Sequence, residues 1–139
     1  VQPNISQEQK NDPDAQIANL RRILALSGRP GAEPRLLLWP EAAIDNGFAL
    51  EEDPVLRAAL ARRLGPRDVL LTGGVAFEYD AFGSIVGARN SVFAMDAAGV
   101  VRGRYDKSHL VPYGEYLPMR TLLEPIGLAR LVPGDLDFW

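Results

Sequence analysis

Residues 35–41 read Arg-Leu-Leu-Leu-Trp-Pro-Glu, and this stretch decides the fold class. Its apolar side chains follow one another without interruption as far as Trp39, a pattern typical of strands that are buried on both faces. Pro40 ends the strand because proline has no N–H to donate to a sheet ladder. Glu41 is therefore predicted to lie at the C-terminal edge of a buried strand.

One helix is predicted before this strand in the sequence and another after it. Apolar residues at helical spacing predict a helix over residues 12–27, starting at Asp12 or Pro13, with Asp12 as its N-cap and Gly28 as its stop. A second helix is predicted over residues 54–64 and closes at Gly-Pro. Its cap is predicted to be Asp53, and its inward-facing residues Val55, Leu56, Leu60 and Leu64.

Further stretches have the composition of strands. Residues 68–77 read as a second buried strand, and residues 1–2 as the tail of an earlier one. Residues 90–95 and 100–105 are strand-like and are joined by Asp-Ala-Ala-Gly, which is typical of a hairpin turn. Strands alternate with helices in the first half and follow one another in the second. We therefore expect an α/β fold with a mixed sheet and helices packed over it.

Composition excludes several classes of protein. The chain has 139 residues, 47% of them hydrophobic, which is enough for one domain with its own core. Its 15 basic and 18 acidic side chains create no field that would attract nucleic acid, so no nucleic-acid partner is expected. The apolar runs are far shorter than the roughly 20 residues that cross a bilayer, so the chain as given is expected to be soluble. Without cysteine there is no disulfide and no thiolate metal site, and no cofactor is expected.

Glu41 is the first candidate site residue. The C-terminal ends of strands in an open α/β sheet face a crevice, where functional groups usually lie. Trp39 and Pro40 beside it would keep water away, an environment that suits a general base or acid. The alternative is a glutamate that caps the loop after the strand.

Lys107 and Glu115 are the next candidates. Lys107 follows the strand over residues 100–105 and can stabilise negative charge on a tetrahedral intermediate; the alternative is a solvated strand end. Glu115 lies within residues 112–118, where two prolines, a glycine and aromatic rings make a rigid loop of the kind that carries functional residues. His109 is expected to pack or to hydrogen-bond within its loop rather than to catalyse.

Five segments carry a resemblance to a known family. They are Val1-Gln2-Pro3-Asn4-Ile5, Leu38-Trp39-Pro40-Glu41-Ala42-Ala43-Ile44, Arg89-Asn90-Ser91-Val92-Phe93, Gly103-Arg104-Tyr105-Asp106-Lys107 and His109-Leu110-Val111-Pro112-Tyr113-Gly114-Glu115-Tyr116-Leu117-Pro118. In order and roughly in spacing they resemble the nitrilase, or carbon-nitrogen hydrolase, superfamily, and within it the apolipoprotein N-acyltransferase branch. Trp-Pro-Glu is shared by many nitrilase relatives, whereas residues 107–118 are specific to this branch.

The resemblance implies an α-β-β-α sandwich with a Glu-Lys-Cys triad. Glu41 matches the general base, Lys107 the residue that stabilises the oxyanion, and Glu115 a supporting glutamate. Asn90 and Tyr113 are the candidate substrate-binding residues. In this branch a phospholipid donates an acyl chain to the cysteine, and the chain then passes to the α-amino group of a lipoprotein's diacylglyceryl-cysteine. The enzyme lies in the bacterial inner membrane, with this domain on the periplasmic face.

Two departures from the family pattern define what the chain is expected to be. The family's cysteine lies downstream of the segment matching residues 131–135, and its membrane helices precede the domain. Residues 1–139 are therefore expected to be the truncated N-terminal portion of one nitrilase-like domain, inactive alone. In addition, Asn11 stands where many members have tryptophan. The alternatives are a soluble amidase or nitrilase of the same superfamily, and a non-catalytic nitrilase-like binding or assembly module.

Overall fold

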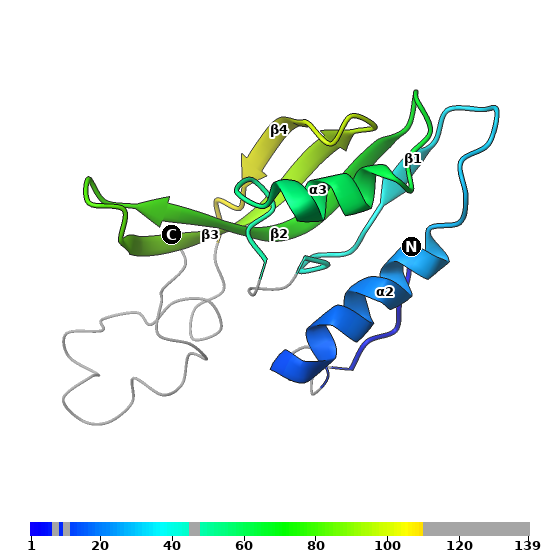
Figure 1. Cartoon of the computed structure of the whole chain (residues 1–139). Coiled ribbons are helices and arrows are strands. Elements are labelled where there is room, and N and C mark those ends of the chain that lie inside the picture. Colours follow the sequence, from blue (N-terminus) through cyan, green and yellow to red (C-terminus); the bar gives the residue numbers. More distant parts are fainter. Residues whose placement is uncertain (7–8, 10–11, 45–47, 110–139) are drawn as a thin grey trace.

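The computed structural model describes residues 1–6, 9, 12–44 and 48–109 (Figure 1). Its strands form one four-stranded sheet in the order β1-β2-β3-β4. β1 (Leu36–Leu38) pairs in parallel with β2 (Val69–Tyr79), whereas β3 (Ile85–Asp96) and β4 (Val101–Asp106) continue the sheet as an antiparallel meander. The predicted α/β class and mixed sheet are confirmed.

The first helical segment consists of a 3₁₀ turn, η1 (Pro13–Ala15), and the helix α2 (Gln16–Leu26). Asp12 begins it as predicted, since its Oδ1 accepts a hydrogen bond from the N–H of Asp14 at 2.9 Å. Gly28 follows the helix with a φ of 68°, a left-handed conformation that glycine adopts without strain. The predicted stop is therefore confirmed, and Asp12 caps the 3₁₀ turn; α2 itself has Ala15 at its N-cap, with no side-chain cap bond.

The second helix, α3 (Pro54–Ala61), has the predicted cap but ends earlier than predicted. Asp53 Oδ1 accepts hydrogen bonds from the N–H groups of Val55 and Leu56, each at 2.9 Å. The chain tightens into turns after Ala61, so Leu64 lies beyond the helix. The prediction that Val55 faces inward is wrong: it is exposed, because it lies about 100° around the helix axis from the buried Leu56. The other three predicted residues are buried.

The helices and one face of the sheet enclose the core. Ile23 of α2 and Leu60 of α3 belong to the same buried cluster as Leu37 of β1. Strand alternation carries this inner face across the sheet through Leu70, Phe93 and Met95, which are buried as well. The core described here therefore packs against one face of the sheet.

The other face of the sheet is apolar but open. Leu36 and Leu38 are more than half exposed, so the prediction that this strand is buried on both faces is wrong for the part of the chain described. Pairing continues the same face through Val69, Leu71, Val92 and Tyr105. The described residues supply one helix layer and one sheet of the expected α-β-β-α sandwich, and the complete sandwich stays a prediction.

β2 and β3 extend beyond the predicted segments 68–77 and 90–95. The added residues of the two strands pair with each other, and Glu78 forms an ion pair with Arg89 across them. Pairing between two segments is not visible in the apolar pattern of either one alone. Residues 1–2, predicted as the tail of a strand, form no strand, although the Val1 nitrogen donates to the carbonyl of Leu38 at 2.7 Å.

The hairpin turn between β3 and β4 is confirmed. Asp96 Oδ1 accepts hydrogen bonds from the N–H groups of Ala98 and Val100, at 2.9 and 3.0 Å. Gly99 has a φ of 75°, which explains why glycine stands there. The turn joins β3 to β4 at the end of the hairpin opposite Asn90 and Lys107.

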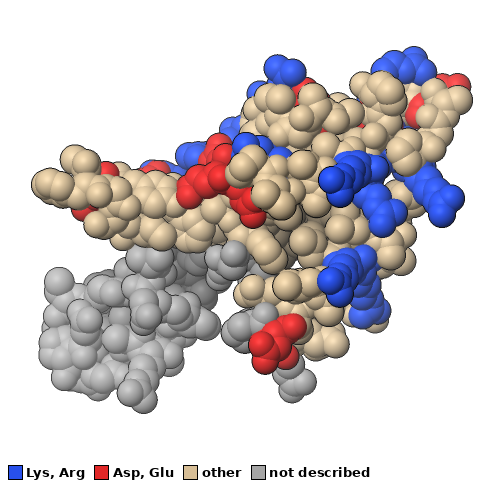
Figure 2. All heavy atoms as spheres, viewed as in Figure 1, with Lys and Arg blue, Asp and Glu red and all other residues tan. Residues whose placement is uncertain are grey.

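Basic and acidic side chains form small groups, some of them next to each other, on the face shown in Figure 2, within a surface that is mostly uncharged. Arg104 of β4 bonds to Glu51, in the loop before α3, at 2.8 Å. Among the helices that the structure describes, none is long and apolar enough to cross a lipid bilayer.

One ion pair lies where β1 and β2 begin. Arg35 donates to Asp68 Oδ2 through Nη2 at 2.7 Å and through Nε at 2.9 Å, and the Asp68 carboxylate is buried. Asp68 also accepts the N–H of Gly65 at 2.7 Å. The hydrogen bonds from Arg35 and Gly65 lower the pKa of Asp68, although burial opposes them. The pair thus stabilises the fold only while Asp68 is ionised.

We predict a pH dependence of stability from this carboxyl. Because the folded-state pKa of Asp68 is below its unfolded value, its contribution is complete above about pH 4 and is lost as the pH falls further. The urea midpoint of Asp68→Asn should therefore be lower than that of wild type at pH 6 and should fall less between pH 6 and pH 3. Asp96 and Asp106, whose pKa values are also lowered, should contribute to the decline that remains in Asp68→Asn. Equal declines in the two proteins would contradict this role of Asp68.

Candidate active site

Glu41 lies in a loop that is fastened to β2 on both sides. The Trp39 N–H donates to the carbonyl of Leu71 at 2.9 Å, and the Ile44 N–H donates to the carbonyl of Gly73 at 3.0 Å. Pro40 ends β1, as predicted, so the chain turns out of the sheet at this point. Glu41 therefore leaves the C-terminal end of β1 from a loop with a defined position.

Gly73 permits the close approach of this loop to the sheet. A Cβ atom at position 73 would lie 2.8 Å from Glu41 Cα, 2.9 Å from Ala42 N and 2.9 Å from the carbonyl oxygen of Pro40. All three are backbone atoms, which cannot turn aside as a side chain can. Ala42 itself has a φ of 53°, a left-handed conformation that costs a non-glycine residue about 1–2 kcal/mol. The backbone around Glu41 is thus tightly constrained.

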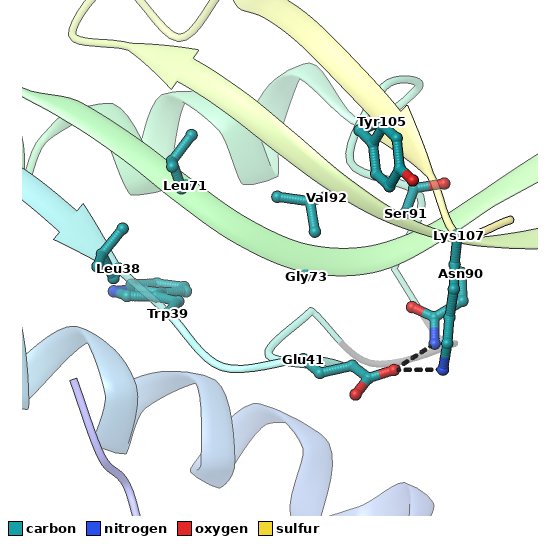
Figure 3. Close-up of a pocket in the computed structure, with 10 residues that line it drawn as sticks. All are labelled: Leu38, Trp39, Glu41, Leu71, Gly73, Asn90, Ser91, Val92, Tyr105 and Lys107. Atoms are coloured by element: carbon teal, nitrogen blue, oxygen red, sulfur yellow. Dashed lines mark hydrogen bonds and ion pairs between the residues drawn. The ribbon is translucent and has the colours of Figure 1, made fainter. Parts of the chain in front are cut away.

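Asn90 and Lys107 converge on one oxygen of Glu41 (Figure 3). Asn90, on β3, donates through Nδ2 to Glu41 Oε1 at 2.7 Å. Lys107, immediately after β4, donates through Nζ to the same Oε1 at 3.3 Å. The Lys107 N–H also donates to the carbonyl of Asn90 at 2.8 Å. Three segments far apart in the sequence therefore meet at a single carboxylate.

The predicted site residues divide into two groups. Glu41, Lys107 and Asn90 are brought together, whereas Glu115 and Tyr113 lie outside the described residues, as does Asn11. Asn90 was predicted to bind substrate; in this structure its amide contacts Glu41. The catalytic and substrate-binding roles of all these residues stay predictions.

Trp39 does not shield Glu41 from water. Its ring is buried in the core, where Nε1 donates to the Ser27 hydroxyl at 2.9 Å, and Ser27 in turn donates to the Ile23 carbonyl at 2.8 Å. The Glu41 side chain is 64% exposed. The expectation of a water-excluded carboxylate is therefore wrong for the described part of the chain, because Trp39 is turned toward α2. Trp39 instead anchors the end of β1 to that helix.

A cavity of about 420 Å³ lies beside this carboxylate. Its lining residues are Leu38, Trp39, Glu41, Leu71, Gly73, Asn90, Ser91, Val92, Tyr105 and Lys107. The polar groups are concentrated at one end, and the open apolar face of the sheet forms the remainder (Figure 3). Such a site suits a substrate with a long apolar part next to a polar reacting group.

Two further residues, His109 and Gly73, lie at or near the site. His109 lies within hydrogen-bond distance of Ser108, with Nδ1 3.2 Å from its hydroxyl oxygen, so the predicted bond within its loop is confirmed. Gly73 was not predicted to matter. Glycines inside a strand often mark a close backbone approach, and the Gly-Gly pair in β2 was the signal that could have identified it. Within the described residues no cluster of His, Asp and Glu is suited to hold a metal ion.

Three proteins with the same name are similar to this chain. An apolipoprotein N-acyltransferase of Allorhizobium ampelinum is 35% identical over 143 residues, which cover 99% of this chain and 27% of that protein. The proteins of the same name from Rhizobium rhizogenes and Brucella suis are each 36% identical, over 99% and 95% of this chain and 27% and 25% of their own lengths. The chain is a relative of the apolipoprotein N-acyltransferases.

The similarity has a defined extent. The chain spans about a quarter of the length of these relatives, and it aligns with them over nearly all of its own residues. No protein-family model matches it. A crystal structure of an N-terminal amidase superposes with a TM-score of 0.47 and 18% identity over 70% of this chain and 25% of that one, a similarity too weak to support a conclusion. The resemblance seen in the sequence is confirmed at the level of the acyltransferase name.

Proposed function

We propose that this chain is the Glu-Lys portion of an acyltransferase site in an apolipoprotein N-acyltransferase, and that a cysteine elsewhere in the protein supplies the nucleophile. What supports the proposal is the convergence of Lys107 Nζ and Asn90 Nδ2 on Glu41 Oε1 beside an apolar cavity. Glu41 is the general base, Lys107 the cation that stabilises the oxyanion, and Glu115 a supporting carboxylate. Asn90 and Lys107 both donate to Oε1, and Oε2 is proposed to be the oxygen that exchanges the proton.

The first half-reaction forms a thioester. Glu41 takes the proton of the thiol, and the thiolate sulfur attacks the ester carbonyl carbon of a phospholipid. The oxyanion that forms is stabilised by the ammonium of Lys107. When the intermediate collapses, the carbon–oxygen bond breaks, the leaving oxygen takes the proton from Glu41, and a lysophospholipid departs.

The second half-reaction forms an amide. The α-amino nitrogen of the lipoprotein's diacylglyceryl-cysteine attacks the thioester carbon and gives its proton to Glu41, while Lys107 again faces the oxyanion. Collapse then breaks the carbon–sulfur bond, and the thiolate recovers the proton from Glu41. The same base therefore serves both halves of the reaction.

The apolar part of the cavity is proposed to hold the acyl chain. Leu38, Leu71, Val92 and Tyr105 line it, and the carboxylate lies at its polar end. Tyr113 is proposed to contact the substrate as well. Because both substrates are lipids, we propose that the whole protein works at the periplasmic face of the bacterial inner membrane.

Acyl transfer by the full-length protein that contains this chain tests the function. With a fluorescent phospholipid donor and a diacylglyceryl peptide acceptor, we expect an N-acylated peptide, and without acceptor we expect an acyl-enzyme that hydroxylamine cleaves. Residues 1–139 alone should be inactive because they contain no cysteine. Hydrolysis of small amides without acyl transfer would overturn the proposal in favour of an amidase, and absence of both activities would favour a binding module.

A further inference from the structure

The residues next to Asn90 and Lys107 bind each other. Ser91 and Asp106 are direct partners in the β3–β4 register. Because side chains alternate along a strand, both lie on the opposite face of the sheet from the side chain of Asn90. The backbone bond from Lys107 N to the Asn90 carbonyl lies beside this pair. The backbone hydrogen bond between Lys107 and Asn90 therefore has the Ser91–Asp106 pair next to it, on the face of the sheet away from the cavity.

Asp106 is held by two different donors. The Ser91 hydroxyl, which is buried, donates to Asp106 Oδ1 at 2.7 Å. Arg104 contacts both carboxylate oxygens, with Nε 2.8 Å from Oδ1 and Nη2 3.0 Å from Oδ2. Arg104 is fixed in turn by Glu51 at 2.8 Å, and Arg89 Nε lies 3.8 Å from Asp106 Oδ2. The carboxylate thus connects β4 to β3 and to the loop before α3.

These contacts keep Asp106 charged. Its partial burial raises the pKa, but the hydrogen bonds from Ser91 and Arg104 and the positive charges of Arg104 and Arg89 outweigh burial, so that the pKa is lowered overall. Asp106 is therefore ionised at neutral pH, and an ionised carboxylate forms stronger hydrogen bonds than a neutral acceptor. These hydrogen bonds hold the last residue of β4 in place, and Lys107 is the next residue in the chain.

We propose that Asp106 is a positioning residue for Lys107: held by Ser91 and Arg104, it fixes the strand end from which the Lys107 ammonium reaches Glu41. This inference rests on the proposed function of Lys107. Lysine has a flexible stem, so the direction of its ammonium depends on where its backbone is held. Lys107 is the first residue after β4, where a strand end without an anchor would fray. Asp106 supplies that anchor on the face away from the chemistry.

Asp96 provides a matched control on the same hairpin. Its carboxylate is ion-paired with Arg102 at 2.6 Å, as that of Asp106 is with Arg104. The two side chains are almost equally exposed, at 26% and 27%. Asp96 lies at the turn end of the two strands, however, and Asp106 at the end next to Lys107. A loss of general stability should therefore appear in both variants, and a loss of positioning only in the Asp106 variant.

The test compares Asp106→Ala, Asp106→Asn and Asp96→Ala in the full-length protein. We expect Asp106→Ala to lower kcat about 100-fold, with KM changed by less than about two-fold, since misplacement near a site reduces the rate rather than the binding. Asp106→Asn should recover part of the rate because its amide oxygen still accepts from Ser91. Asp96→Ala should lower the melting temperature but leave kcat within about two-fold of wild type. Equal losses of kcat in Asp96→Ala and Asp106→Ala would overturn the proposal.

A second readout does not depend on the reaction. The Lys107 amine is labelled with acetic anhydride, and the modified peptide is quantified by mass spectrometry. Asp106→Ala should label faster than wild type, because Lys107 is released from Glu41, and Asp96→Ala should label at the wild-type rate. Unchanged labelling in Asp106→Ala overturns the positioning role. An inactive wild-type protein would instead refute the proposed function, and the labelling result would still decide the role of Asp106.

Discussion

Glu41→Gln in the full-length protein should reduce kcat for acyl transfer by roughly 10²- to 10⁴-fold, the usual contribution of a general base. The amide keeps the size of the carboxylate, and its oxygen can still accept hydrogen bonds from Asn90 and Lys107, so KM should change little. What the amide cannot do is take a proton from the thiol or from the attacking amine. Steady-state kinetics with varied phospholipid and fixed acceptor give both constants.

Glu52→Gln is the matched control for Glu41. Glu52 is also a glutamate bound by a side-chain donor, the Tyr79 hydroxyl at 2.5 Å, but it lies outside the cavity. Its variant should keep kcat within about two-fold of wild type. If Glu41→Gln retains more than about a tenth of the wild-type kcat, Glu41 is not the base, because general-base catalysis contributes at least 10²-fold. Its ion pair with Lys107 would then be structural.

The ends of the strands were predictable from local sequence. Pro40 stops β1 for a covalent reason, and the turn before β4 follows from Asp96 and Gly99, so the sequence placed Glu41 and Lys107 just past two strand ends. The Asp53 cap of α3 and the glycine stop after α2 were predictable from similarly local signals. Such signals act within a few residues, and tertiary contacts rarely override them.

Contacts between distant segments were not predictable in this way. The bond between Asn90 and Glu41 joins residues 49 apart in the sequence, and it depends on the register of β3 against β2. The direction of the Trp39 ring depends on a hydroxyl at Ser27, which no apolar pattern indicates. The burial of β1 was overpredicted because a continuous apolar run does not say which face another layer covers. The contacts of the site could therefore not be predicted without knowing how the strands pair in the sheet.

Gly73→Ala should damage both the fold and the activity, although it adds one methyl group. That methyl would lie 2.8–2.9 Å from backbone atoms of the loop that carries Glu41, whereas carbon contacts are comfortable at about 3.5–4.0 Å. Because the loop is hydrogen-bonded to Gly73 itself through Ile44, it cannot withdraw without breaking that bond. Overpacking of this kind costs about 1–3 kcal/mol of unfolding free energy. The displaced Glu41 should also lower kcat about 100-fold.

Gly103→Ala separates this clash from the general effect of replacing a strand glycine. Gly103 lies in β4 of the same sheet, and a Cβ there would meet no atom within 4 Å. Its variant should be neutral or slightly stabilising, because alanine loses less backbone entropy on folding than glycine does. Melting temperature and kcat are measured for both variants in the full-length protein. If Gly73→Ala matches Gly103→Ala in both, the loop tolerates a side chain at position 73, and the close approach of Glu41 to β2 does not hold the carboxylate in place.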